Sequence, residues 1–293
     1  MREALYAYTA ALGRQLGFEN LAIAGNLLGR TLWTAAPSRA RLATDAVAFH
    51  LEKTPEEAAR IAKASFSHNC RSFLESMLTS SVDWRFVRDR LHIVNPEILR
   101  EAARAQGPTV LTTAHMGAWE LLTGIFHLFF HHPYKHVVVR TLPDAALNAL
   151  TIRQRTRPSV SIIEHRQAAA KVLRSLKRGG ATAFLVDHNC RHDEAVFLPF
   201  LRKTAAVNVG PALLAVRSGA GVWPAFMRRT EEGGYVLQFD EPLMTADIPG
   251  DWRDKLDVTA LFYTQAVERW VRAWPEQWFW MHKRWKTRPN GEA

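Results

Sequence analysis

A histidine and a glutamate lie five positions apart in the segment His-Met-Gly-Ala-Trp-Glu, as His115 and Glu120. A carboxylate that keeps one imidazole nitrogen protonated leaves the other nitrogen free to take a proton from an alcohol. Five positions on a straight α-helix turn two side chains about 140° apart, so the pair can meet only if His115 precedes a helix. Gly117 would permit the backbone turn that this needs. The spacing indicates a general base, or else a hydrogen-bonded junction histidine and a surface or capping glutamate.

The flanking sequence predicts where this segment lies in the fold. Residues 108–114 are a β-branched run after Gly107, typical of a buried strand, and residues 117–130 are long and apolar enough for a helix. His115 is therefore expected at a strand-to-helix junction. In a parallel sheet, active sites gather outside the carboxyl ends of the strands.

The rest of the chain continues the alternation of strands and helices. Strands are predicted at residues 135–140, 159–163, 181–186, 222–228 and 235–239, and helices at 145–155, 167–177, 210–217 and 256–273. This order predicts an α/β fold with a mainly parallel central sheet flanked by helices.

The first hundred residues contain no clustered glycine and predict a helical layer. Thr54-Pro55-Glu56-Glu57 supplies an N-cap, a proline at the first helical position and two acidic residues in the first turn. The apolar stretch 21–33 is expected to be a helix at a membrane interface or against the core. We therefore expect an N-terminal helical layer at 1–105 and an α/β domain at 106–293, joined in one globular unit.

Composition narrows the class of protein. The 293 residues are 47% apolar and carry 38 Lys and Arg against 28 Asp and Glu, a net charge of +10. Such a chain has material for a sizeable core, and its charge indicates nucleic acid, an anionic membrane surface or an acidic partner. Cys70 and Cys190 lack CxxC spacing, which excludes a disulfide framework and fits a cytoplasmic setting. Neither a signal peptide nor an apolar run of spanning length is expected.

Several polar residues outside the His115 segment are candidates for binding. Arg140, at a predicted strand end, could clamp a phosphate bidentately, or could form an ion pair with Glu120 or Asp187. Asp187 could orient a substrate-binding group or cap the loop that follows it. Arg202 and Lys203 could contact a phosphate or form a solvated pair of cations.

Other chemistries are weakly supported. The histidines at 127, 131, 132 and 136 have near-helical spacing, but no cysteine or nearby acid completes a site, so no metal is expected. No G-x-S-x-G elbow indicates a serine hydrolase. The Trp, Arg and Lys run at 278–286 suits a nucleic-acid platform, a membrane interface or a packed tail.

Taken together, the motifs resemble the bacterial lipid A biosynthesis late acyltransferases, within the glycerolipid acyltransferase superfamily. HMGAWE is similar to the H-x-G-x-W-E form of the HxxxxD/E motif in that family. Further blocks resemble the family in order along residues 20–289: Arg140 with Pro143 and Asn148; Asp187; 196–200 with Gly210-Pro211; 220–228; and the 275–286 run containing Trp278, His282 and Lys286.

This resemblance implies an O-acyltransferase that moves a fatty acyl chain from acyl carrier protein, or from acyl-CoA, to a lipid hydroxyl. His115 would be the general base and Glu120 would orient it; backbone N–H groups near Gly117, and Arg140, would stabilise the oxyanion. The further substrate-binding residues would be Asp187, Asn148 and Lys203. No cofactor beyond the acyl donor is implied, and the +10 charge is expected to meet carrier protein, phosphorylated lipid and the anionic inner leaflet rather than nucleic acid.

The implied acceptor is a lipid A precursor, and the implied location is the cytoplasmic face of the bacterial inner membrane, as a peripheral protein. Two alternatives stay open: transfer to another lipid, such as a lysophospholipid, an ornithine-type lipid or a glycolipid, and a catalytically silent binding protein of the same fold. Two departures bear on the substrate: Leu201-Arg202-Lys203 follows Phe200 where the family has Phe-Gly, and His188 replaces a glutamine.

Overall fold

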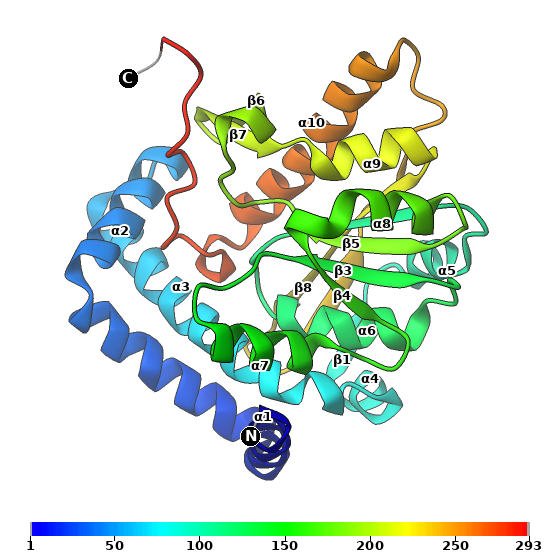
Figure 1. The fold of residues 1–293 in the computed structure, drawn as a ribbon. Helices are drawn as coiled ribbons and strands as arrows, with labels where there is room; N and C mark the ends of the chain where they lie inside the picture. The colour runs from blue at the N-terminus through cyan, green and yellow to red at the C-terminus, as the bar shows by residue number, and fades with distance from the viewer. Residues whose placement is uncertain (1, 292–293) are drawn as a thin grey trace.

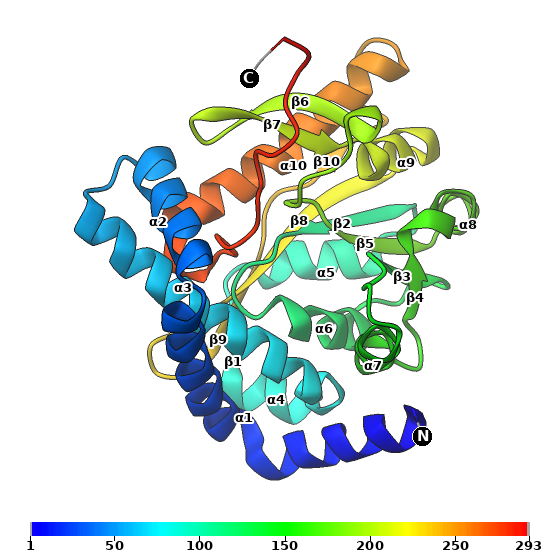
Figure 2. The same ribbon diagram turned by 60° about the vertical axis from the view of Figure 1, so that its left-hand side comes forward.

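A sheet of eight strands runs through the centre of the protein, and helices cover both of its faces (Figures 1 and 2). The computed structural model describes residues 2–291. Seven strands follow the order β1-β9-β8-β2-β5-β3-β4, and β10 pairs with β8. All neighbouring pairs are parallel except β8–β9 and β10–β8. A mainly parallel central sheet flanked by helices was expected, and the fold class is confirmed.

The strands are β1 (Leu91–Ile93), β2 (Thr109–Thr113), β3 (Lys135–Val139), β4 (Ser161–Glu164), β5 (Ala181–Leu185), β8 (Gly221–Arg229), β9 (Tyr235–Phe239) and β10 (Leu243–Met244). A separate antiparallel hairpin consists of β6 (Ala195–Phe200) and β7 (Lys203–Asn208).

The α-helices are α1 (Arg2–Ala35), α2 (Pro37–Leu51), α3 (Pro55–Glu75), α4 (Trp84–Arg90), α5 (Pro96–Arg104), α6 (Leu122–Phe129), α7 (Ala145–Arg155), α8 (Ala168–Leu176), α9 (Gly210–Ser218) and α10 (Trp252–Ala273). Five short 3₁₀ turns are η1 (Ser76–Ser81), η2 (Trp119–Leu121), η3 (His165–Gln167), η4 (His192–Glu194) and η5 (Pro275–Gln277).

The N-terminal helices form a layer along one side of the sheet (Figure 1). The start of α3 has the expected capping box, in which Thr54 and Glu57 exchange side-chain and backbone hydrogen bonds. Gly25 and Gly29 allow α1 to lie directly against α3, since a Cβ at Gly29 would come within 2.4 Å of the Ser67 backbone. Side chains of α2 and α3 share one buried cluster with the sheet and with α8, α9 and α10.

Some elements differ from the sequence-based expectation. The region 1–105 is not wholly helical, because β1 joins the edge of the central sheet beside β9. The helix expected at 117–130 is instead a 3₁₀ turn, η2, followed by α6. The β6–β7 hairpin was not expected, because its residues carry little alternation of apolar and polar side chains.

Candidate active site

His115 lies just beyond the C-terminal end of β2, on a loop that is tied to its neighbours. Its imidazole is 31% exposed, whereas Ala114 and Met116 on either side are buried. Gly117 has φ +55°, and a Cβ there would lie 2.1 Å from the Met227 carbonyl oxygen. Only glycine therefore fits this turn, which was expected from its place in the motif.

Asp187 holds the imidazole of His115. The Asp187 Oδ1 atom lies 2.8 Å from His115 Nδ1, and Oδ2 accepts hydrogen bonds from the His115 backbone N–H at 2.9 Å and from Trp278 Nε1 at 2.8 Å. The Asp187 side chain is fully buried. A carboxylate at Nδ1 assigns the proton to that nitrogen and leaves the lone pair of Nε2 free.

The register of two strands explains this pair. Thr113 of β2 lies opposite Leu185 of the parallel strand β5. Two residues further along each strand are His115 and Asp187, so both side chains emerge at the same edge of the sheet. Strand order is not readable from the sequence, and the short-range spacing pointed to Glu120 instead.

Glu120 does not contact His115, which corrects the expectation that it orients the imidazole. It lies in η2 and is 3% exposed, and its carboxylate accepts two hydrogen bonds from Arg155 of α7, at 2.8 Å from Nε and 2.5 Å from Nη2. The 3₁₀ turn directs Glu120 away from His115 and toward α7. Its partner is therefore Arg155. Glu120 thus connects α7 to the loop that carries His115, residues 114–118, which we call the histidine loop.

The electrostatics around Asp187 favour its ionised form. Burial by itself would raise the pKa of Asp187, but attraction to His115 and the hydrogen bonds from His115 and Trp278 outweigh it, so the pKa falls well below its usual range. Burial lowers the pKa of His282 to about 4, and also that of His188 to about 4. His282 and His188 are thus neutral at pH 7, so neither competes with His115 for the negative charge of Asp187.

The backbone N–H groups near Gly117 do not serve as oxyanion donors in this conformation. The Gly117 N–H donates to the Gln277 carbonyl at 3.0 Å, and the Ala118 N–H donates to the Met227 carbonyl at 2.8 Å. Contact of Gly117 with substrate stays a prediction, because both N–H groups are already bonded within the protein. Both amides hold the histidine loop in place instead.

The remaining predicted binding residues fall in different settings. Arg140 is exposed at the end of β3, and its charge is near enough to oppose protonation of His188. Asn148 is engaged within the α7 region, since its Oδ1 accepts from the Leu142 N–H and its Nδ2 donates to Glu164. Asn148 thus fastens the loop after Arg140.

Lys203 is an exposed residue of the β6–β7 hairpin, and its Nζ is 5.5 Å from the centre of the Phe49 ring. Arg202 faces the same ring and pairs with Glu52. Leu201, in the turn, has φ 55°, a region that favours glycine. Leu201 is therefore a strained residue of this turn, with two cations beside it.

An apolar cavity lies between the sheet and α6, close to His115. Trp119 lines its wall and packs edge-on against the imidazole with ring centroids 5.5 Å apart. Glu120 and Arg155 also line it, together with apolar side chains of five strands and α6, among them Leu111, Phe126, Phe130, Val137, Val139, Ala183, Ala225 and Phe239. The cavity has a volume of about 60 Å³, and its wall is mainly apolar apart from three threonines and the Glu120–Arg155 pair.

The C-terminal tryptophans belong to the core around Asp187. Trp278 and Trp280 are 0% and 1% exposed, and Arg284 is buried with its Nη1 donating to the Ala206 carbonyl at 2.6 Å. Trp285 stacks on His50 with ring centroids 3.5 Å apart. Of the three interpretations of this segment, the packed tail describes these side chains, because such buried rings cannot present a platform for bases.

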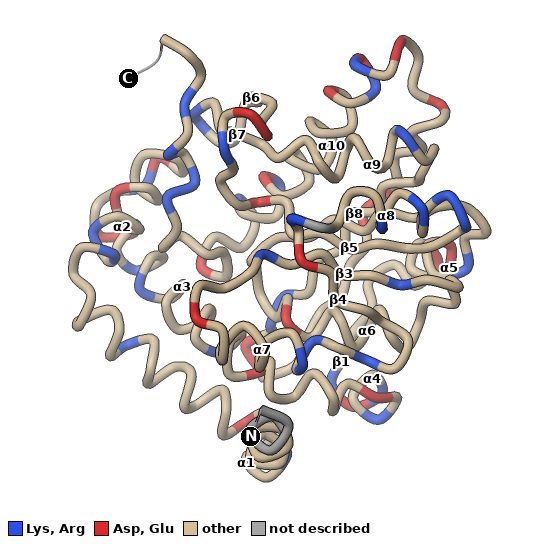
Figure 3. The backbone as a smooth tube through the Cα atoms, viewed as in Figure 1, with Lys and Arg blue, Asp and Glu red and all other residues tan. Residues whose placement is uncertain are grey.

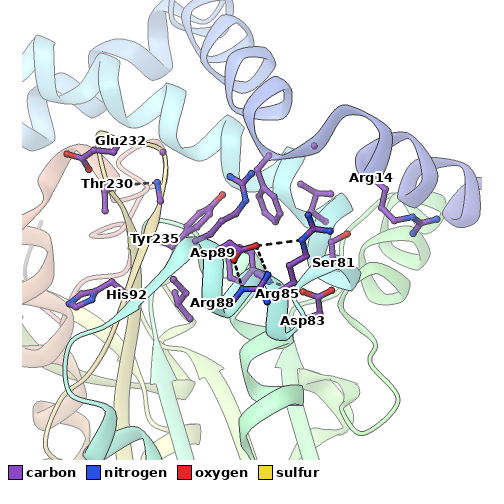
Figure 4. A pocket seen from close by; sticks show the side chains of 18 residues that line it. Arg14, Ser81, Asp83, Arg85, Arg88, Asp89, His92, Thr230, Glu232 and Tyr235 are labelled. Carbon is purple, nitrogen blue, oxygen red and sulfur yellow. Dashed lines mark hydrogen bonds and ion pairs between the residues drawn. The ribbon is translucent and has the colours of Figure 1, made fainter.

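A large open groove lies away from His115, between α1, α4 and the turn that joins β8 to β9 (Figure 4). Its charged side chains are partly paired with one another: Arg85 and Arg88 both contact Asp89, as the dashed lines of Figure 4 show. Within residues 2–291, no group of three or more His, Cys, Asp or Glu side chains is arranged to hold a metal ion. The His115–Asp187 pair is therefore the candidate active site.

Comparison with known proteins identifies the family of this chain. Residues 2–287 match the family model described as bacterial lipid A biosynthesis acyltransferase. The chain belongs to the bacterial lipid A biosynthesis acyltransferase family, and the expected resemblance is confirmed.

Curated relatives from Escherichia coli (strain K12) match part of the chain. The lipid A biosynthesis lauroyltransferase is 32% identical over 139 residues, 47% of this chain and 44% of the relative. The lipid A biosynthesis palmitoleoyltransferase is 30% identical over 124 residues, 42% of this chain and 39% of the relative. The matched segments thus span less than half the length of these relatives.

A solved structure, the 1-acyl-sn-glycerophosphate acyltransferase PlsC of Thermotoga maritima, aligns with 86% of this chain and 98% of its own at a TM-score of 0.37 and 10% identity.

Proposed function

We propose that the protein transfers a fatty acyl chain to a hydroxyl group of a lipid A precursor. The donor is an acyl thioester, either of acyl carrier protein or of CoA. The hydrogen bond of 2.8 Å between His115 Nδ1 and Asp187 carries the proposal, because it leaves Nε2 as a base on an imidazole that is 31% exposed. Membership of the family supports the lipid acceptor.

In this mechanism His115 Nε2 removes the proton of the acceptor hydroxyl as its oxygen attacks the thioester carbonyl carbon. The tetrahedral intermediate collapses, the C–S bond breaks, and the thiolate leaves with the proton from Nε2. Asp187 stabilises the imidazolium that exists between the two transfers. No acyl-enzyme is formed, and no metal or organic cofactor is needed.

The apolar cavity beside Trp119 is the proposed starting point of the acyl-chain site; its volume is about 60 Å³, so it would have to widen to hold a fatty acyl chain. Its wall of Phe, Leu and Val side chains removes aliphatic surface from water, worth about 0.8 kcal/mol per buried CH₂ group. The Glu120–Arg155 pair would border the chain near the thioester. Arg140, exposed and near His188, would contact a phosphate of the acceptor or the donor.

We further propose that the protein binds the cytoplasmic face of the inner membrane through α1. Ile23 and Leu27, on the outer face of this helix, are 66% and 65% exposed, and Leu28 and Leu32 extend the apolar surface. None of the helices within residues 2–291 combines the length and hydrophobicity needed to cross a bilayer. Interfacial binding of this kind would place the enzyme beside its lipid acceptor.

The proposal is tested by incubating the purified protein with acyl carrier protein or CoA thioesters and a panel of lipid acceptors. Wild type should acylate the lipid A precursor, and His115→Ala should not. Acylation of a lysophospholipid, an ornithine-type lipid or a glycolipid instead would keep the reaction and replace the acceptor. Binding of lipid without transfer to any acceptor would contradict the enzymatic proposal.

A further inference from the structure

A fully buried ion pair lies behind the histidine loop, between α3 and β8. Glu75 and Arg229 have side chains that are each 0% exposed. Arg229 Nε donates to Glu75 Oε1 at 3.1 Å, and its Nη2 contacts Oε2. Tyr235 donates its hydroxyl to Oε1 at 2.9 Å. These residues are 154 and 160 positions apart from Glu75, and nothing in the sequence singles them out.

One side of this ion pair reaches the histidine loop through Ser72. Arg229 Nη2 donates to Ser72 Oγ at 2.8 Å, and Ser72 Oγ donates to the Gly117 carbonyl at 2.5 Å. A hydroxyl has a single proton. Because Arg229 donates to the Ser72 oxygen, that proton is directed toward a carbonyl. The His68 carbonyl is a second acceptor, but at 3.1 Å it is the weaker one.

The other side reaches the same loop through Gln277. Its side-chain amide forms two hydrogen bonds with the Arg229 backbone, accepting from the N–H at 2.9 Å and donating to the carbonyl at 3.0 Å. Its own carbonyl accepts the Gly117 N–H at 3.0 Å. The N–H and the carbonyl of Gly117 therefore each form a hydrogen bond with a residue that Arg229 contacts directly.

We propose that Arg229 is a positioning residue for the reaction, which fixes the peptide two residues beyond His115 through Ser72 and Gln277. The proposal rests on His115 being the general base. A buried ion pair is expensive to desolvate and can often be replaced by apolar side chains without loss of stability. The role of this ion pair is to fix the geometry of the histidine loop, because a misplacement of about 1 Å at a reacting group can cost about 10²-fold in rate.

Ser72→Ala tests the link with the smallest change to the core, and Ser65→Ala is its matched control. Both serines lie on α3 and are 0% exposed, but Ser65 donates only to the Ala62 carbonyl of its own helix. We expect Ser72→Ala to lower kcat about tenfold or more with KM for the thioester unchanged within twofold. Ser65→Ala should leave both constants within twofold of wild type.

Arg229→Lys supplies the second arm, because a lysine can pair with Glu75 but lacks the fork that also reaches Ser72. Its kcat should fall as in Ser72→Ala, and the double variant should be no slower than the slower single variant. Equal effects of Ser72→Ala and Ser65→Ala, or additive effects of Ser72→Ala and Arg229→Lys, would overturn the inference. A wild-type protein that transfers acyl chains independently of His115 would instead overturn the proposed function.

Discussion

Asp187 holds His115 at two points, through the imidazole Nδ1 and through the backbone N–H, although the residues are 72 positions apart. The carboxylate thus fixes both the ring and the end of the strand that presents it. It is itself buried under Trp278, whose indole N–H donates to Oδ2. This arrangement gives Asp187 the orienting role that spacing along the chain assigned to Glu120.

Asp187→Asn should lower kcat by about 10²- to 10⁴-fold while changing KM little. The amide cannot stabilise the imidazolium, and it can present its NH₂ group to Nδ1 and thereby favour the wrong tautomer. Steady-state kinetics with a fixed acyl thioester measure the effect. A variant with wild-type kcat would show that the hydrogen bond at Nδ1 has no part in catalysis.

Glu120→Gln should destabilise the fold by about 3 kcal/mol, because it leaves the guanidinium of Arg155, which is only 18% exposed, without its counter-charge. The double variant Glu120→Gln, Arg155→Gln should be more stable than Glu120→Gln alone, since the unpaired charge is gone. Urea unfolding of the variants measures both free energies. If the double variant is less stable than Glu120→Gln, the destabilisation does not come from an unpaired Arg155.

The sequence predicted much of the fold but not this pairing. Local patterns placed β2, α7 and the capped start of α3 close to where the structure has them, because apolar periodicity and caps act within a few residues. The orienting role was assigned to Glu120 instead of Asp187 because Asp187 reaches His115 only through the pairing of β5 with β2, an adjacency that depends on strand order. The Glu75–Arg229 pair was missed for the same reason, since its members meet only in the folded core.

Stability should decrease on acidification through buried histidines. Burial, followed by the charge of Lys135, lowers the pKa of His132 to about 4, against about 6.5 in an unfolded chain. Between those values the unfolded state binds more protons, so stability is fully present above pH 6.5 and falls toward pH 4.

His132→Gln should therefore reduce the difference in unfolding free energy between pH 7 and pH 4.5 by about 2 kcal/mol. His92→Gln, at an exposed position, is the control and should leave that difference unchanged. Urea unfolding at the two pH values tests this. An equal pH dependence in the His132 variant and in wild type would be inconsistent with a buried neutral imidazole.

Replacing Ile23 and Leu27 with serine should weaken binding to anionic vesicles at least tenfold, a loss of about 1.4 kcal/mol, because less apolar surface would leave water. Both side chains are about two-thirds exposed, so the thermal midpoint should not change. Asn20→Ser, an exposed position on the same helix, is the control. Vesicle sedimentation measures binding, and unaltered affinity would place the membrane contact elsewhere.

The central claim is that His115 is the base that activates the acceptor hydroxyl. The most direct measurement is single-turnover transfer of a labelled acyl chain from acyl carrier protein to a lipid A precursor by wild type and His115→Ala, with both proteins shown to have the same thermal midpoint. The account predicts product with wild type and a rate at least about 10²-fold lower with the variant. Equal rates would contradict it.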